Sequence, residues 1–91
     1  MAVTVKLPTQ LRPAAGNASE ARVDGATVGE ALDQLYAQHA ELRSRMADDG
    51  GGLRRFVNVY LGGEDIRFLE GLETPVADGD ELTILPAVAG G

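Results

Sequence analysis

The 91-residue sequence predicts an α+β domain, in which a mixed sheet packs on one main helix. Residues 3–7 and 56–61 have the alternating or β-branched composition typical of strands, and residues 81–85 follow the same pattern. Between the first two of these segments, residues 28–46 repeat apolar side chains at helical spacing. Strands on both sides of one helix favour a helix packed across a sheet, so we expect the first and last strands to lie side by side in its middle.

Two strands are predicted before the helix. Residues 3–7 alternate between apolar and polar side chains, which is the period of a half-buried strand. The prolines and glycine of residues 8–17 predict a turn region. Residues 20–23 are expected to form a second short strand, which the turn dipeptide Asp24-Gly25 closes.

A capping box predicts the start of the helix. Thr27 stands three residues before Glu30, which matches the S/T-x-x-E pattern. The apolar residues that follow fall at i, i+3, i+4, i+7 and i+8 and form one stripe: Val28, Ala31, Leu32, Leu35 and Tyr36. His39 continues this face across a break, together with Leu42 and Met46, and is therefore expected to be a packed or rim residue rather than a ligand or base. Residues 50–52, all glycine, end the helical region in a loop.

The second half of the sequence alternates strands and turns. Residues 56–61 (FVNVYL) are rich in β-branched and aromatic side chains and predict a strand. Residues 62–65 are expected to form a turn, and residues 66–68 a short strand. Residues 69–75 are interpreted as an irregular crossing.

A tail follows the last strand. The tight turn at residues 78–80 leads into the strand at residues 81–85, and Pro86 cannot donate a ladder hydrogen bond, so strand pairing is expected to fade there. Residues 87–91 have little to bury and are predicted to be a mobile tail on a domain formed by residues 1–86. The sequence contains no internal repeat and no sign of a second domain.

Composition excludes several classes of function. The formal net charge of −6 argues against binding to nucleic acid, which needs a basic face, and suits a partner with a more basic surface. No apolar run is long enough to span a bilayer, and residues 1–10 lack the pattern of a signal peptide, so a cytoplasmic location is expected. The sequence has no cysteine and only one histidine, His39, which disfavours a thiol nucleophile and a metal site.

The two glycines that end the sequence are the most informative feature. Alone they mean little, because the chain holds twelve glycines. Here they directly follow a well-patterned strand and a proline, and glycines can thread a narrow channel because they lack a Cβ. A carboxylate at Gly91 would be ionised at neutral pH and would become an electrophile only after activation, for which adenylation by ATP is one route. With no cysteine in the chain, this terminus is the obvious place to carry sulfur.

Two stretches of the sequence resemble a known family. Residues 78–82 (DGDEL) and 84–91 (ILPAVAGG) together resemble the end of the ThiS/MoaD family, ubiquitin-like β-grasp sulfur carriers of thiamin and molybdopterin synthesis. Residues 55–60 (RFVNVY) and the LPAVAGG ending are most similar to the bacterial branch that supplies sulfur for cysteine biosynthesis. The resemblance spans nearly the whole chain, is strongest over residues 55–91 and is weakest over residues 10–25.

The resemblance implies a role for each residue of the tail. Gly91 would be adenylated by an E1-like enzyme that uses ATP, and would then bear the sulfur as a thiocarboxylate. Gly90 would pass with it through the narrow channels of the enzymes, and Ala89 and Val88 would be threaded behind it. The chain itself would bind no cofactor and no metal, and would be a protein cosubstrate rather than an enzyme.

The resemblance also implies partners. A cysteine synthase that depends on PLP would accept the sulfur and form a cysteinyl adduct, from which a metalloprotease of the JAMM type would release cysteine and regenerate Gly91. A thiazole-synthase-like or thiosugar-forming enzyme of specialised metabolism is an alternative acceptor. The tail sequence does not separate these acceptors.

A docking surface is predicted on the last strand. Strand alternation places Leu82 and Ile84 on one face and leaves Leu85 on the other. We expect Leu85, with Phe56 or Tyr60, to form an exposed apolar patch for partners. The alternative interpretation is that these residues close a minor core or lie scattered on the surface.

Three other functions remain open. The small subunit of molybdopterin synthase shares the tail, although the FVNVY stretch and the loop at residues 48–52 weakly disfavour this function. A ubiquitin-like covalent modifier would pass its terminus to a lysine amine, and Lys6 is the only lysine of the chain that could accept it. An interaction module with an accidental tail is the last alternative.

Overall fold

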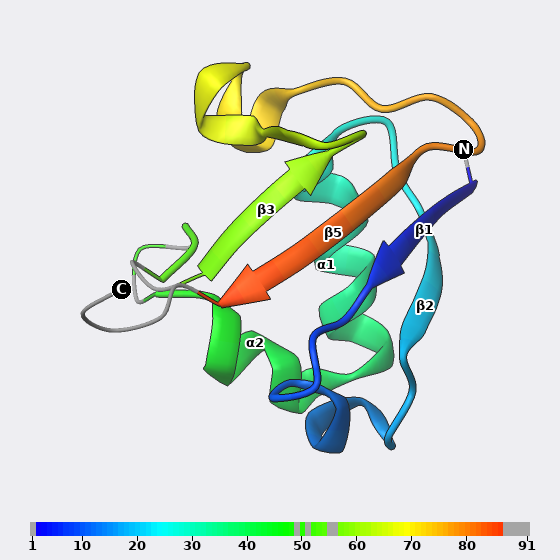
Figure 1. The fold of residues 1–91 in the computed structure, drawn as a ribbon, viewed down its shortest axis with the longest axis vertical. Coiled ribbons are helices and arrows are strands. Elements are labelled where there is room, and N and C mark those ends of the chain that lie inside the picture. The colour runs from blue at the N-terminus through cyan, green and yellow to red at the C-terminus, as the bar shows by residue number, and fades with distance from the viewer. Residues whose placement is uncertain (1, 49, 51, 55–56, 87–91) are drawn as a thin grey trace.

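The strands and helices of the chain are defined by a computed structural model, which describes residues 2–48, 50, 52–54 and 57–86 (Figure 1). The strands are β1 (Ala2–Lys6), β2 (Glu20–Asp24), β3 (Val57–Leu61), β4 (Glu64–Asp65) and β5 (Glu81–Pro86). The helices are α1 (Val28–Gln38) and α2 (Ala40–Met46), and three short 3-10 helices are η1 (Arg12–Ala15), η2 (Ile66–Phe68) and η3 (Gly71–Glu73).

The five strands form one mixed sheet in the order β2-β1-β5-β3-β4. β1 and β5 are parallel neighbours in its middle, with Val5 opposite Leu82, and the flanking strands pair antiparallel with them. The expectation that the first and last strands lie side by side is therefore confirmed. Figure 1 shows α1 and α2 together on one face of this sheet, while none of the described helices crosses the other face.

The core lies between the sheet and the two helices. The predicted stripe of α1 is buried along its whole length: Val28, Ala31, Leu32, Leu35 and Tyr36. From the sheet, Val5 and Leu82 are fully buried and Ile84 is 1% exposed. Each such side chain contributes about 1.5–3 kcal/mol through removal from water, so this contact holds the helices on the sheet.

The helix begins at the predicted capping box and is interrupted at His39. Thr27 Oγ1 accepts a hydrogen bond from the Glu30 N–H at 3.2 Å, and Glu30 Oε1 accepts one from the Ala26 N–H at 2.9 Å. At His39 the backbone leaves the helical region, with φ −136° and ψ 82°, which starts α2 in a new direction. Leu42 is nevertheless fully buried in the same core, as the apolar pattern predicts.

The prediction for residues 62–68 is only partly right. Gly62 and Gly63 form the expected turn, but Glu64–Asp65 is β4 and the expected strand at Ile66–Phe68 is η2. The cause is Asp65, whose Oδ1 accepts a hydrogen bond from the Arg67 N–H at 2.9 Å and bends the chain into a 3-10 turn. Because a 3-10 helix has three residues per turn, Ile66 is 2% exposed while Phe68 is 83% exposed; a strand would have put both on one face.

Four strand ends differ by one residue from the prediction. β1 spans Ala2–Lys6 instead of residues 3–7, and β2 and β5 each end one residue later than predicted. β2 continues to Asp24, which pairs with Ala2, and β5 continues to Pro86, which pairs with Val57. Proline is tolerated at this last position because the ladder ends there in the described part of the chain, so its missing N–H costs little.

We expect Gly25→Ala to lower the free energy of unfolding by about 1–3 kcal/mol through overpacking. A Cβ at Gly25 would lie 2.6 Å from the backbone nitrogen of Ala31 and 3.0 Å from the backbone carbon of Glu30, and neither atom can move without distorting the first turn of α1. Urea unfolding measures the change. Gly50→Ala is the control, since its Cβ would lie 3.5 Å from the Asp48 side chain, and equal stability of both variants would contradict this account.

Candidate functional site

The described part of the chain ends with β5, whose last residues pair with β3. Pairing of β1 with β5 ends at Lys6 opposite Thr83, whereas β3 accompanies β5 as far as Val57 opposite Pro86. Figure 1 shows that β5 ends on the side of the molecule where α2 lies. The predicted reactive residue Gly91 and the predicted threading residues 88–90 lie outside the described residues, so these predictions remain untested.

The outer face of the sheet carries two of the three predicted docking residues. Leu85 is 45% exposed and lies opposite Asn58, and Tyr60 lies opposite Thr83 on the same face and is partly buried. Leu85 and Tyr60 are thus diagonal cross-strand neighbours, close enough for an aromatic ring and a leucine to share one surface. The third residue, Phe56, falls outside the described part of the chain. Whether these residues bind a partner stays a prediction.

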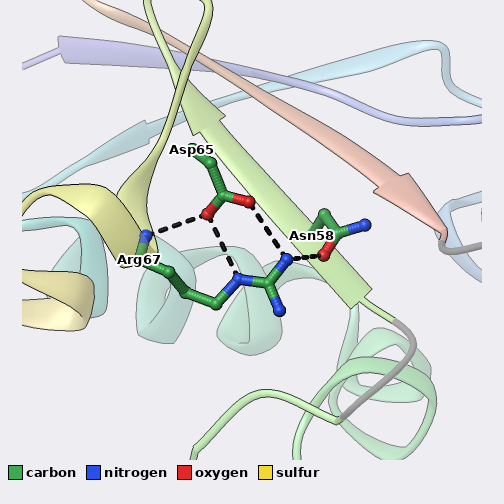
Figure 2. A network of polar contacts seen from close by, with 3 residues as sticks. All are labelled: Asn58, Asp65 and Arg67. Atoms are coloured by element: carbon green, nitrogen blue, oxygen red, sulfur yellow. Dashed lines mark hydrogen bonds and ion pairs between the residues drawn. The ribbon is translucent and has the colours of Figure 1, made fainter.

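A polar network that the sequence analysis missed borders this face (Figure 2). Asp65 is almost buried, with a side chain 10% exposed, and its two oxygens accept hydrogen bonds from Arg67 Nε at 3.3 Å and Arg67 Nη2 at 3.0 Å. Arg67 Nη2 also donates to Asn58 Oδ1. The network therefore connects η2 to the outer face of β3, at the position directly opposite Leu85.

The network shifts the ionisation of both charged groups. Hydrogen bonds from the Arg67 side chain and then from its backbone N–H lower the pKa of Asp65. The hydrogen bonds and charge of Asp65 raise the pKa of Arg67. Both side chains are therefore charged at neutral pH. The Asp-x-Arg spacing is the one local signal for this pair, while the contact with Asn58 depends on the tertiary fold.

Side chains that could carry out catalysis are scarce in the described residues. These residues contain no group of three or more His, Asp or Glu side chains placed to hold a metal ion. Burial, followed by the charge of Asp33, raises the pKa of Tyr36 to about 12, so its phenol is neutral at physiological pH. A cavity of about 540 Å³ lies beside α2, and its lining includes Arg43, Ser44 and Arg54. No helix in the described chain is long and apolar enough to cross a membrane.

The five-stranded order with parallel central strands and helices on one face defines a ubiquitin-like β-grasp protein. The sequence model of the ThiS family matches residues 5–91. The chain therefore belongs to the ThiS family.

Several known proteins are similar to this chain. The sulfur carrier protein CysO of Mycobacterium tuberculosis is 47% identical over 93 residues that span 100% of both chains. A solved structure, the BexX/CysO complex of Amycolatopsis orientalis, matches with 49% identity and a TM-score of 0.89, covering 98% of this chain and 99% of the matched chain. Small archaeal modifier protein 1 of Haloferax volcanii is 46% identical over 70 residues, or 76% of each chain. The chain is thus a homologue of CysO, which confirms the resemblance proposed from residues 78–91.

We predict that Asp65→Asn destabilises the fold at neutral pH and that this loss shrinks in acid. The folded-state pKa of Asp65 lies below its ordinary value of 3.8, so the ionised carboxylate stabilises the fold above pH 3.8 and this contribution is lost as the pH falls through the folded-state pKa. Urea unfolding of wild type and variant at about pH 6.5 and about pH 3 measures both differences. Glu64→Gln, which removes an exposed carboxylate from the same strand, is the control. A difference that is the same at both pH values would contradict the prediction.

Proposed function

We propose that this protein is a sulfur carrier whose last residue, Gly91, is converted to a thiocarboxylate that donates sulfur to a biosynthetic enzyme. The observation that carries the proposal is similarity to CysO along the full length of both chains. It is supported by β5, which leads from the buried centre of the sheet directly to the tail.

The proposed chemistry has two steps. An E1-like enzyme joins the Gly91 carboxylate to the α-phosphate of ATP, which gives an acyl-adenylate and releases pyrophosphate. A sulfur donor at the oxidation level of sulfide then attacks the acyl carbon and AMP leaves, so the terminus holds a thiocarboxylate and no net oxidation occurs. A carboxylate needs this activation because it is ionised and resists nucleophiles at neutral pH.

The tail residues fit a threading role. Gly90 and Gly91 lack a Cβ and can adopt backbone angles that other residues avoid. Ala89 is small, and Val88 is the bulkiest residue beyond Ala87, so the chain narrows toward the reacting end. In this proposal the enzymes supply the catalytic groups, and the carrier supplies a narrow tail attached to a folded domain.

The partners follow from the same chemistry. The acceptor that we propose first is a cysteine synthase with PLP, followed by a JAMM-type metalloprotease that regenerates Gly91; a thiazole-synthase-like or thiosugar-forming enzyme is the alternative. ATP and PLP would be bound by these enzymes, and the carrier would act in the cytoplasm as a cosubstrate rather than as an enzyme.

A covalent modifier is the second candidate. The similarity to small archaeal modifier protein 1 favours it, because the same activated terminus could pass to an amine instead of to sulfur. Polymers through side chains would use Lys6, which is about half exposed and pairs with Glu81 at 3.6 Å. Attachment to lysines of other proteins has no such limit.

We expect Leu85→Asp to weaken binding to the activating enzyme about tenfold, as the loss of an interface anchor does. The side chain is 45% exposed, so the free energy of unfolding should change by about 0.5 kcal/mol or less. Isothermal titration calorimetry measures the affinity. Ala37→Asp, at an exposed position of α1, adds the same charge away from the sheet and is the control. Unchanged affinity of a folded Leu85→Asp would exclude this docking patch.

Conversion of Gly91 is tested by intact-protein mass spectrometry. Wild type and a Gly91 deletion are incubated with ATP, sulfide and an E1-like enzyme that is active on the CysO of M. tuberculosis. We expect the wild type alone to gain the mass difference between sulfur and oxygen. No gain in wild type, while CysO is converted in the same reaction, would refute the sulfur-carrier proposal and leave the modifier to be tested.

A further inference from the structure

Within the described residues, only some of the hydrogen-bond donors of the Arg67 guanidinium have a partner. Arginine has five N–H donors. Those of Nε and Nη2 bind Asp65 and Asn58. Across the described residues, no hydrogen bond engages the two N–H groups of Nη1, and Figure 2 shows this nitrogen pointing away from Asp65. The Arg67 side chain is 63% exposed, so Nη1 is available to another molecule.

The Arg67 guanidinium lies near the described end of β5. Asn58, which holds the guanidinium, is opposite Leu85, and the adjacent Val57 is opposite Pro86. One residue of a strand spans about 3.3 Å, so the network lies within a few ångströms of the end of β5 along the sheet. A protein that encloses the chain beyond Pro86 must approach this part of the surface.

The guanidinium is held in place before any partner arrives. Its anchor, Asp65, is almost buried, belongs to β4 and accepts two hydrogen bonds from the Arg67 side chain. An unrestrained arginine loses up to about 2 kcal/mol of side-chain entropy when it is fixed at an interface, and a fixed one loses less. Arginine is one of the residue types enriched among the few residues that carry most of the binding energy of an interface. Asn58, which accepts a hydrogen bond from Arg67, lies opposite the exposed Leu85.

We propose that Arg67 is a docking residue that binds a carboxylate on the enzyme receiving the tail, through the two N–H groups of Nη1. The inference rests on the proposed function. A planar guanidinium favours a carboxylate, and one side of this group is already paired in that way with Asp65. A second copy of the chain is a poor candidate for the partner, because each copy carries a net charge of −6. The carboxylate would contact Arg67 while an apolar surface of the same enzyme covers Leu85.

The test uses the full-length chain and the E1-like enzyme of the mass-spectrometry experiment. Arg67→Gln is compared with Arg22→Gln, which removes the same charge from the outer face of β2 at the other edge of the sheet. We expect Arg67→Gln to raise the KM for the carrier about tenfold with kcat unchanged, because docking and not the reaction at Gly91 is affected. Arg22→Gln should leave KM within about twofold of wild type, since exposed charges far from an interface matter little.

Two further measurements distinguish an effect on the stability of the fold from an effect on docking. Arg67→Lys keeps the charge but not the planar fork, so it should recover only part of the lost affinity. If thermal melting shows that Arg67→Gln is partly unfolded, Arg67→Lys becomes the decisive variant and its KM should still rise severalfold. If the wild type is converted but Arg67→Gln and Arg22→Gln have the same KM, this inference is overturned and the proposed function stands. Failure of the wild type to gain sulfur would overturn the proposed function and this inference with it.

Discussion

The parallel pairing of β1 with β5 is the contact on which the rest of the structure depends. It joins segments 77 residues apart in sequence, with Val5 opposite Leu82 and both side chains fully buried. Because this pair occupies the middle of the sheet, β5 cannot separate without exposing the core that α1 and α2 cover. Core strands of this kind open only in near-global unfolding. The tail is therefore attached to the part of the fold that is hardest to open, which suits the proposed role of the terminus as a substrate that enzymes draw into narrow sites.

The same pairing decides which residues surround the exit of the tail. With β1 on one side of β5, the other side belongs to β3, so Asn58 and Tyr60 reach the outer face next to Leu85 and Thr83. β4 and η2 then cover the far edge of β3, and Asp65 lies where its carboxylate can hold Arg67 against Asn58. A mainly apolar inner face and a mixed outer face are thus produced by strand alternation alone.

How much of this was predictable from sequence depended on the range of the interactions. The helix stripe, its cap at Thr27 and the burial of Leu82 and Ile84 follow from local periodicity, and the structure has them as predicted. Residues 66–68 were mispredicted because the bond between Asp65 and the Arg67 N–H outweighs the apolar alternation of Ile66 and Phe68. The contact of Arg67 with Asn58 joins residues nine positions apart across a turn, and no periodicity reports such a contact.

Net charge is a poor guide to the docking chemistry of this protein. A charge of −6 favours a basic partner surface, as the sequence analysis expected. Three of the fourteen acidic residues, however, lie where β1 and β5 begin. Asp78 accepts a hydrogen bond from the Ala2 N–H, Asp24 pairs with Ala2, and the Asp80 carbonyl accepts a hydrogen bond from the Thr4 N–H. The other end of β5 has the guanidinium of Arg67 nearby. Screening limits interactions between exposed charges to about 8–10 Å, so an enzyme that binds the tail responds to the second end far more than to the first. A partner with an acidic group at the tail and basic groups farther out is the complement of this charge distribution.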